Sequence, residues 1–385
     1  MNRTSAHKDL RIAMIGTRGV PARYGGFETC VEEVGKRLTK KGHSITVYCR
    51  KGYYSQRPRY YRGMSLCFLP NISNKVLDTL SHTFLSVLHA LFRRYDVYMV
   101  FNAANSIALI PLRLFGKNIV INTDGLEWKR SKWGIVGRSF YKISEKLACI
   151  LSNRLISDSK GIKEYYLSRH NTESSKIAYG ADIQKCEKPD IILEMGLRPF
   201  EYFLQITRFE PENNPLLTIE AFKRSNTGKK LVLVGGNPYH TEYVKKINAA
   251  SYDHDDILLP GFIYDEAVLR ELWCFCFAYI HGNEVGGTNP ALLQTMACGC
   301  FTMSIDVPFN RDVLNGCGKF FQKNVNSLEY EMKWAVTHKS ELAPYKAKAI
   351  DRISTEYSWD KMAELYEKLF YSVSEGRYPW NPGFL

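Results

Sequence analysis

The stretch RIAMIGTRGVPARYGGFETC, residues 11–30, decides the fold class of this chain. It begins with a short apolar run, Arg11–Ile15, which ends in glycine and is typical of a buried strand. A glycine-rich loop follows, and apolar residues then recur at helical spacing from Phe27 to Leu38, with Gly42 as the stop. A strand, a tight loop and a helix in this order predict an alternating α/β domain.

The same alternation continues through both halves of the chain. In the first half we expect a long helix at residues 76–92 and strands at residues 44–49, 97–101, 119–122 and 155–157. In the second half we expect helices between strands at residues 202–206, 231–234, 257–259, 277–280 and 301–304. The pattern therefore predicts two Rossmann-like, doubly wound domains with mainly parallel sheets.

The length of 385 residues suits two domains of ordinary size. The link is expected in the polar stretch 182–199. We assign residues 1–185 to an N-terminal domain and residues 186–365 to a C-terminal domain. Residues 366–385 are expected to form a helix end and a tail that packs back on the N-terminal domain.

Composition and charge exclude some classes of protein. Apolar residues make up 45% and charged residues 24%, which is a globular balance and not that of a disordered or fibrous chain. The net charge of +13, placed mostly in the first half, calls for an anionic partner such as a phosphorylated molecule or an anionic membrane face. Nucleic acid is not expected, because the basic groups are not interleaved with aromatics in a recognised module.

The ten cysteines and the N-terminus indicate a cytoplasmic protein. Several cysteines lie in apolar runs and indicate small buried side chains in a reducing compartment, and none has zinc-site spacing. The first residues lack the apolar core of a signal peptide, and the stretch 106–115 is too short to span a bilayer. Asp253 and Asp255 resemble a metal-binding pair but are expected in a solvated turn, so no metal site is predicted.

Two glycine-rich loops are candidates for binding an anion. The first contains Gly16, Gly19, Gly25 and Gly26 and lies between a strand and a helix, where free amides and the helix dipole favour negative charge. A dinucleotide site is disfavoured, because the spacing is not GxGxxG and the second strand ends without an acid. A plain tight loop remains the alternative.

The second such loop precedes a helix in the C-terminal half. Gly286 and Gly287 leave amides free, Asn289 is a good N-cap, and Pro290 is a good first helical residue. Two anion sites facing one cleft fit a diphosphate that joins a nucleotide to a sugar. Arg208, just after the first strand of the second half, supplies a cation for that diphosphate, with a surface ion pair as the alternative.

A third loop, residues 122–130, follows an apolar strand and contains Asp124, Glu127 and Trp128. Carboxylates accept hydrogen bonds from sugar hydroxyls, and an indole face stacks on a pyranose, so the loop suits sugar recognition. The alternative is equally consistent with the local pattern: Asp124 caps a helix and Trp128 packs in the core.

Several long motifs in this order resemble one family of enzymes. They are GTRGxPAxYGGFET at residues 16–29, a stretch at 74–82, DGLEWKRxKWG at 124–134, RFEPENN at 208–214 and VGGTNPxLL at 285–293. The chain resembles the retaining glycosyltransferases of family four, which have the GT-B architecture. It is most similar to bacterial rhamnosyltransferases that carry an N-terminal domain of unknown function.

This resemblance implies roles for individual residues. Asp124 would contact the transferred sugar, and Arg208 would bind the diphosphate. The glycines of the first loop would border the donor phosphates and the acceptor, and His82 would face the cleft. The remaining donor contacts would come from Gly286, Gly287, Thr288, Asn289 and Gln294, and those to acceptor or sugar from His82, Glu127 and Trp128.

The chain departs from the broader family at charged positions. The family has two glutamates with seven residues between them, where this chain has Gly286 and Gln294, and it has a lysine where this chain has Asn213. Phosphate charge must then be met by Arg208, by amides or by another basic residue, for which Arg18 and Arg23 are candidates.

The resemblance further implies that the reaction needs neither metal nor cofactor, since the nucleotide-diphosphate sugar is a co-substrate. It suggests dTDP-rhamnose as donor and a lipid-linked or other glycan as acceptor, for cell-surface polysaccharide. The chain would then be cytoplasmic, with peripheral contact at the inner membrane face through the helix 76–92 and Arg93–Arg94. Three alternatives stay open: the same fold with a UDP- or GDP-sugar, a sugar-nucleotide epimerase, and a non-catalytic binding protein.

Overall fold

The computed structural model describes residues 8–22, 25–72, 77–123, 125–129, 133–237 and 241–380. The chain divides into two compact units. The first unit comprises residues 1–128, 133–178 and 359–385, and the second comprises residues 129–132 and 179–358. We predicted a boundary after residue 185, whereas the second unit begins at residue 179. We predicted another after residue 365, which falls inside a helix of the first unit.

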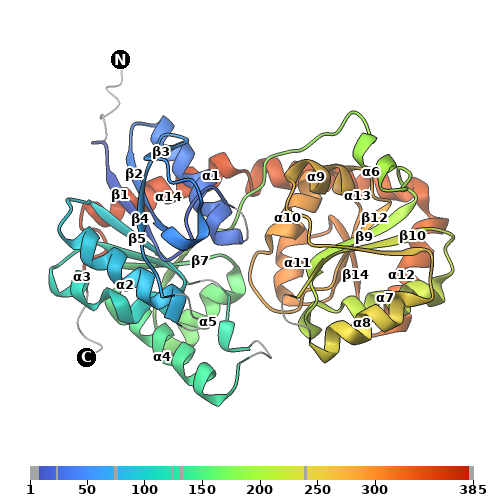
Figure 1. The fold of residues 1–385 in the computed structure, drawn as a ribbon, viewed down its shortest axis with the longest axis horizontal. Helices are drawn as coiled ribbons and strands as arrows, with labels where there is room; N and C mark the ends of the chain where they lie inside the picture. Colours follow the sequence, from blue (N-terminus) through green and yellow to red (C-terminus); the bar gives the residue numbers. More distant parts are fainter. Residues whose placement is uncertain are drawn as a thin grey trace. The chain divides into compact units, whose positions relative to one another are not determined.

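The first unit is built on an eight-stranded sheet with the order β3-β4-β2-β1-β5-β6-β7-β8 (Figure 1). Neighbouring strands are parallel except β3 and β4, which form an antiparallel pair. The strands are β1 (Arg11–Ile15), β2 (Ser44–Arg50), β3 (Tyr60–Tyr61), β4 (Met64–Leu69), β5 (Val97–Phe101), β6 (Ile119–Asn122), β7 (Arg154–Ser157) and β8 (Ser174–Lys176).

Helices connect these strands in the right order for a doubly wound unit. The α-helices are α1 (Gly26–Lys40), α2 (Leu77–Leu91), α3 (Ile110–Leu114), α4 (Ile135–Leu151), α5 (Lys160–His170) and α14 (Trp359–Ser374). Short 3-10 helices are η1 (Lys51–Tyr53), η2 (Ala103–Leu109) and η3 (Glu127–Lys129). The central strand β5 is buried at every position, as a parallel strand covered on both faces must be.

The second unit has a six-stranded parallel sheet with the order β11-β10-β9-β12-β13-β14. Its strands are β9 (Tyr202–Arg208), β10 (Lys230–Gly236), β11 (Ile257–Gly261), β12 (Ala278–His281), β13 (Thr302–Ile305) and β14 (Gly318–Phe321). Its α-helices are α6 (Asp190–Glu194), α7 (Pro215–Ser225), α8 (Glu242–Tyr252), α9 (Glu266–Phe275), α10 (Pro290–Ala297), α11 (Pro308–Leu314), α12 (Val325–Thr337) and α13 (Leu342–Glu356). Two 3-10 helices complete it, η4 (Pro211–Asn213) and η5 (Lys339–Glu341).

Two apolar clusters cover this second sheet. Phe203 and Leu231 belong to one cluster, whereas their chain neighbours Leu204 and Val232 belong to the other. Because successive side chains of a strand point to opposite faces, the two clusters lie on the two sides of the sheet. The second unit therefore has the covered, mainly parallel sheet that the sequence predicts.

The last helix of the chain, α14, belongs to the first unit and packs against α1. Its buried face includes Trp359, Tyr366 and Phe370. The Tyr366 hydroxyl accepts a hydrogen bond from Asn122 Nδ2 at 3.1 Å and lies 3.5 Å from Cys30 Sγ. These contacts tie the end of the chain to the carboxyl end of β6.

Candidate functional site

The carboxyl ends of β9 and β12, adjacent strands of the second sheet, carry the candidate donor site. The loops that follow them are fastened together: Asn214 Nδ2 donates to the Gly282 carbonyl oxygen at 2.8 Å, and the Glu284 amide donates to the Glu212 carbonyl oxygen at 3.0 Å. A Cβ at Gly282 would lie 2.4 Å from the Asn213 carbonyl oxygen, so only glycine allows this approach. The sheet thus fixes the two loops side by side.

Arg208 is the last residue of β9 and is exposed. Its carbonyl oxygen accepts a hydrogen bond from Asn213 Nδ2 at 2.9 Å. Among the residues that the structure describes, no carboxylate pairs with the Arg208 guanidinium. Asn213, which stands where the broader family has a lysine, is buried and closes the turn that presents Arg208.

The helix α10 begins where the sequence predicts. Asn289 is its N-cap, with Oδ1 accepting from the Ala291 amide at 2.9 Å, and Pro290 is its first residue. Gly286 has a φ of +144° and open space where a Cβ would stand. Glycine is therefore needed here for the backbone conformation and not for close packing. Thr288 is buried, whereas Gly286, Gly287, Asn289 and Gln294 are partly exposed.

Glu284 lies two residues before Gly286 and is already engaged. Its Oε1 accepts from Asn214 Nδ2 at 2.5 Å and pairs with Lys323 Nζ at 2.6 Å. His281, at the end of β12, is completely enclosed, and burial lowers the pKa of its imidazole to about 3. Neither side chain replaces the family acids that Gly286 and Gln294 lack.

An aromatic pair that sequence reasoning missed lies at the same edge of the sheet. Phe262 and Tyr264 follow β11 and stack at 6.0 Å with an interplanar angle of 12°. They are 40% and 65% exposed, and a Cβ at Gly236, which ends β10, would lie 2.9 Å from the Phe262 ring. The sequence signal was two aromatic residues shortly after Gly261, the glycine that ends β11. The two rings offer a flat apolar surface.

In the first unit, two glycines of the loop after β1 are required by close packing. Gly16 has a φ of +97° and would place a Cβ 2.6 Å from the Phe101 carbonyl oxygen. Gly19 has a φ of +110° and would place one 2.5 Å from Cys49 Sγ. Their presence follows from the fold alone, so it does not by itself indicate a ligand.

The amino end of α1 already holds a carboxylate. Gly25 is the N-cap, without a side-chain cap, and Gly26 is the first helical residue. Glu28 Oε1 accepts from the Arg18 amide at 3.0 Å, and a Cβ at Gly25 would lie 2.7 Å from Oε2 of the same glutamate. Because this carboxylate uses the favourable helix end, a phosphate there would meet a like charge.

The loop after β6 is only partly described, and Asp124 lies outside the described residues, as do Arg23, Arg130 and Lys132. Glu127 and Trp128 are partly buried in η3. The Trp128 ring lies 6.3 Å from that of Tyr165 and carries Lys142 Nζ at 4.9 Å from its centroid. Packing against α4 and α5 therefore accounts for Trp128, which favours the structural alternative for this residue.

Trp128 also faces a buried carboxyl that sequence reasoning missed. Glu145 of α4 accepts from the Tyr165 hydroxyl at 3.0 Å and lies 3.8 Å from His170 Nε2. Burial raises the pKa of Glu145 to about 7, with Tyr165, Lys142 and Trp128 acting in the opposite direction. No local sequence pattern marks Glu145, because tertiary packing alone creates this environment.

His82 is enclosed by the protein. It lies on the inner side of α2 with an exposed fraction of 0%. Burial and the nearby Arg50 lower the pKa of His82 to about 4. Because His82 is fully buried, an acceptor contact would require a rearrangement of its surroundings, and that contact stays a prediction.

Part of the second unit is similar to a known family. Residues 198–349 match the family described as glycosyl transferases group 1. The match lies entirely within the second unit. Residues 98–182 match a domain of unknown function, DUF1972, which spans β5 to β8 of the first unit and leaves α14 outside the match. No curated protein sequence matches the chain.

Solved structures show that the whole chain has the GT-B fold. HepE of Anabaena in complex with UDP and glucose is 14% identical with a TM-score of 0.77, over 94% of this chain and 100% of that chain. Sucrose-phosphate synthase from Thermosynechococcus elongatus is 15% identical with a TM-score of 0.79, over 94% and 100%. The starch synthase IV catalytic domain from Arabidopsis thaliana, bound to ADP and acarbose, is 16% identical with a TM-score of 0.74, over 96% and 100%.

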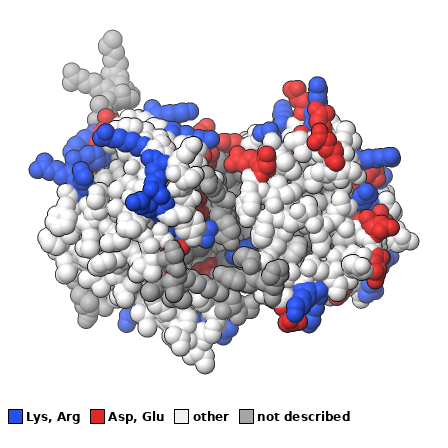
Figure 2. All heavy atoms as spheres, in the orientation of Figure 1, with Lys and Arg blue, Asp and Glu red and all other residues white. Residues whose placement is uncertain are grey.

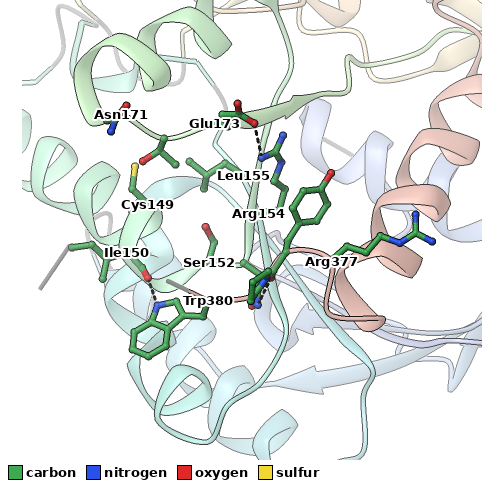
Figure 3. Close-up of a pocket in the computed structure, with 13 residues that line it drawn as sticks. Cys149, Ile150, Ser152, Arg154, Leu155, Asn171, Glu173, Arg377 and Trp380 are labelled. Carbon is green, nitrogen blue, oxygen red and sulfur yellow. Dashed lines mark hydrogen bonds and ion pairs between the residues drawn. The ribbon is translucent and has the colours of Figure 1, made fainter. Parts of the chain in front are cut away.

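A hollow of about 340 Å³ lies within the first unit (Figure 3). It sits in the first unit at the amino end of β7, where Arg154 pairs with Glu173 and Trp380 Nε1 donates to the Ile150 carbonyl oxygen at 2.7 Å. Tyr378 of the C-terminal segment closes it beneath Arg154. No predicted site residue lines this hollow, and it opens at the edge opposite the carboxyl ends of the strands.

Proposed function

We propose that the chain is a glycosyltransferase whose second unit binds a nucleotide-diphosphate sugar. The observation that carries this proposal is that Arg208 and the glycine-rich amino end of α10 lie at the same edge of the sheet. They follow the adjacent strands β9 and β12 inside the region that matches glycosyl transferases group 1. A guanidinium without a carboxylate partner and a helix amino end are both suited to phosphate.

In the proposed reaction, the bond between the anomeric carbon and the diphosphate oxygen breaks as charge develops on the leaving group. Arg208 and the amides around Gly286 and Gly287 stabilise that charge, which is electrostatic stabilisation by groups already in place. In a retaining scheme, the acceptor oxygen bonds to the same face of the anomeric carbon and a phosphate oxygen takes the acceptor proton. Asp124 of the first unit is assigned to the transferred sugar.

The aromatic pair extends the proposed donor site. Phe262 and Tyr264 present a flat, partly exposed surface next to the end of β10, and a nucleobase can stack on such a surface. Gln294 in place of a glutamate leaves neutral hydrogen-bonding capacity for a ribose. In the first unit, the Glu28 carboxylate at the amino end of α1 suits sugar hydroxyls better than phosphate, so Gly25 and Gly26 are assigned to acceptor or sugar.

For the donor sugar we propose rhamnose carried by dTDP, on the motifs at residues 16–29 and 124–134. A UDP- or GDP-sugar is the alternative, and HepE, which shares the fold, is described in complex with UDP and glucose. The acceptor is proposed to be a glycan or a lipid-linked glycan of the cell surface. Peripheral contact with the inner face of the cell membrane is part of this proposal, and no described helix is long and apolar enough to cross a bilayer.

The test is thermal unfolding of the purified chain with dTDP-rhamnose, UDP-glucose, UDP-galactose and GDP-mannose, repeated with Arg208→Ala. Ligands that bind only the native state raise the unfolding temperature, and at equal concentration a tighter ligand raises it more. We expect the largest rise with dTDP-rhamnose and its loss in the variant. A larger rise with a UDP- or GDP-sugar would retain the transferase and replace the donor.

A turnover assay separates the remaining alternatives. Release of nucleotide diphosphate that depends on an added glycan acceptor supports a transferase. Conversion of the donor to an isomer without acceptor indicates an epimerase, and saturable binding without either product indicates a binding protein. Absence of binding by every donor would refute the proposed site.

A further inference from the structure

One face of the first unit is apolar, basic and almost free of acids. It is formed by α2, η2, α3 and α4, which are neighbours: η2 contacts both α2 and α4, and α3 contacts α2. Figure 2 shows a broad uncharged area over this part of the first unit, with Lys and Arg at its margins. We refer to these four elements as the helical face.

The helical face exposes large apolar side chains on each of its four elements. Its most exposed members follow α2, end α3 and open α4: Phe92 85%, Leu114 79%, Phe115 68%, Ile135 85%, Val136 84% and Ile143 61%. Scattered apolar residues are normal on a surface, but a group of this size on neighbouring helices marks an interaction site.

The charges on the helical face have one sign. Arg93 and Arg94 follow α2, and Arg138 and Lys146 lie on the exposed side of α4. The two acids of these elements are not available to a partner, since Asp78 is paired with Arg50 and Glu145 is buried. The exposed positions of the four elements therefore carry mainly apolar side chains, and their only charged side chains are cations.

The distribution of charge over the whole chain points the same way. Residues 1–178 contain 30 Lys and Arg against 12 Asp and Glu, whereas residues 179–358 contain 19 against 23. The net positive charge of the chain thus belongs to the unit that carries the helical face. Apolar side chains that enter the headgroup region beside cations that meet its charge are the combination that peripheral proteins use.

We propose that the helical face docks on the surface of an anionic lipid bilayer. Leu114 and Phe115, at the end of α3 before the turn at Gly116, insert with Ile135 and Val136 of α4. Arg93, Arg138 and their neighbours lie against the headgroups. This surface gives the membrane contact of the proposed function a location, but it needs no glycosyl transfer to form, so the two can fail separately.

The experiment is flotation of the full chain with phosphatidylcholine vesicles, with or without phosphatidylglycerol. We expect binding to the anionic vesicles, weakened by salt, and little binding to neutral ones. The apolar variant replaces Leu114 and Ile135 by glutamate and should abolish flotation. Its matched control replaces Tyr252 and Tyr330 by glutamate, since these are 86% and 62% exposed on the second unit, and should float like wild type.

A charge variant tests the second component. Arg138→Ala with Lys146→Ala should weaken binding to anionic vesicles by roughly fivefold for each charge. The control, Lys245→Ala with Lys246→Ala on α8, should leave it unchanged. Donor-induced thermal stabilisation should persist in all four variants, which shows that they are folded and that the donor site is intact.

Three outcomes would overturn the proposal. In the first, the wild type does not float with anionic vesicles. In the second, the apolar and control variants float equally well. In the third, neither the wild type nor the apolar variant floats, and light scattering shows that only the wild type self-associates, which would make the helical face an interface between copies of the chain.

Discussion

Arg208 ends β9 with its guanidinium unpaired among the described residues, and in the proposed donor site it supplies the cation for the diphosphate. Replacing it with alanine removes charge-assisted hydrogen bonds worth about 1.5–3 kcal/mol. We expect Arg208→Ala to weaken binding of the nucleotide diphosphate about 10- to 100-fold in isothermal titration. Arg208→Lys should recover only part of the loss, because lysine lacks the planar fork.

Arg224→Ala is the matched control for this prediction. Arg224 is a partly exposed arginine of the same unit whose Nε pairs with Glu329 at 3.1 Å, away from the loops after β9 and β12. Its removal should leave donor affinity unchanged. Equal affinities for wild type and Arg208→Ala would remove the guanidinium from the proposed site.

Two glycines of the second unit should respond differently to alanine. Both have positive φ, but a Cβ at Gly235 would lie 1.8 Å from the Thr207 carbonyl oxygen, whereas one at Gly286 meets nothing within 4 Å. Gly286→Ala should cost about 1–2 kcal/mol of stability through backbone strain. Gly235→Ala adds a collision with a neighbouring strand and should cost more than 3 kcal/mol. Urea unfolding measures both, and similar losses would contradict the packing argument.

Glu145 should make stability depend on pH. Burial raises the pKa of its carboxyl to about 7, above its usual value of about 4.5 in the unfolded chain. Between these pH values the native state holds the proton that the unfolded state has lost, so stability falls as pH rises and the full penalty remains above about pH 7. Glu145→Gln removes this penalty and should stabilise by about 1–3 kcal/mol near pH 8, with no gain near pH 4.

Urea unfolding of wild type and Glu145→Gln across this pH range tests the prediction. The groups that face the carboxyl are Tyr165, His170, Lys142 and Trp128, and none carries a negative charge at these pH values. A stability difference that is constant with pH would mean that Glu145 does not titrate in this range.

The residue scale also shows where sequence reasoning succeeds and fails. Asn289 and Pro290 were predictable as cap and first residue of α10, because capping is a local matter. His82 and Glu145 were not, because their burial is decided by helices packing on the sheet. The sequence was consistent with Trp128 either binding a sugar or packing in the core. The choice in favour of packing needed the structure, in which its ring lies against Tyr165.

Among the elements, α14 ties the end of the chain to the loop that begins after β6. Tyr366→Phe would leave Asn122 Nδ2, a buried donor, without the 3.1 Å hydrogen bond that it makes now. A lost intramolecular hydrogen bond costs about 0.5–1.5 kcal/mol, and we expect that loss in urea unfolding. Tyr252→Phe, on an exposed tyrosine of α8, is the control and should cost nothing measurable. Equal stabilities for all three proteins would show that the hydrogen bond is dispensable.

Most elements could be predicted from hydrophobic periodicity, including every strand from β9 to β13 to within a few residues. The short strands β3 and β8 could not, since two or three residues carry no periodic signal. Near the end of the chain, two successive helices, α13 and α14, are divided at Tyr357 and Ser358. The second of these helices belongs to the first unit from its start at Trp359, whereas only residues 366–385 were expected to pack on that domain.

For the whole molecule, the proposed chemistry assigns the neutralisation of the leaving diphosphate to protein groups. Within the described residues, no group of three His, Cys, Asp or Glu side chains is arranged to hold a metal ion. Asp253 and Asp255 are exposed in the turn between α8 and β11, at the amino end of that strand. Arg208 and the start of α10 lie at the opposite, carboxyl edge of the same sheet.

We therefore expect EDTA to leave both donor binding and acceptor-dependent release of nucleotide diphosphate unchanged. Added Mg²⁺ or Mn²⁺ should not increase the rate, because Arg208 and the amides at α10 already meet the charge that a metal would neutralise. The same measurement on Arg208→Ala tests the role of the guanidinium. If Arg208 neutralises the diphosphate, Mg²⁺ should partly restore the activity of the variant and leave that of the wild type unchanged. Loss of wild-type activity in EDTA, with recovery on adding metal, would instead assign the diphosphate charge to a bound ion and reduce Arg208 to a minor contact.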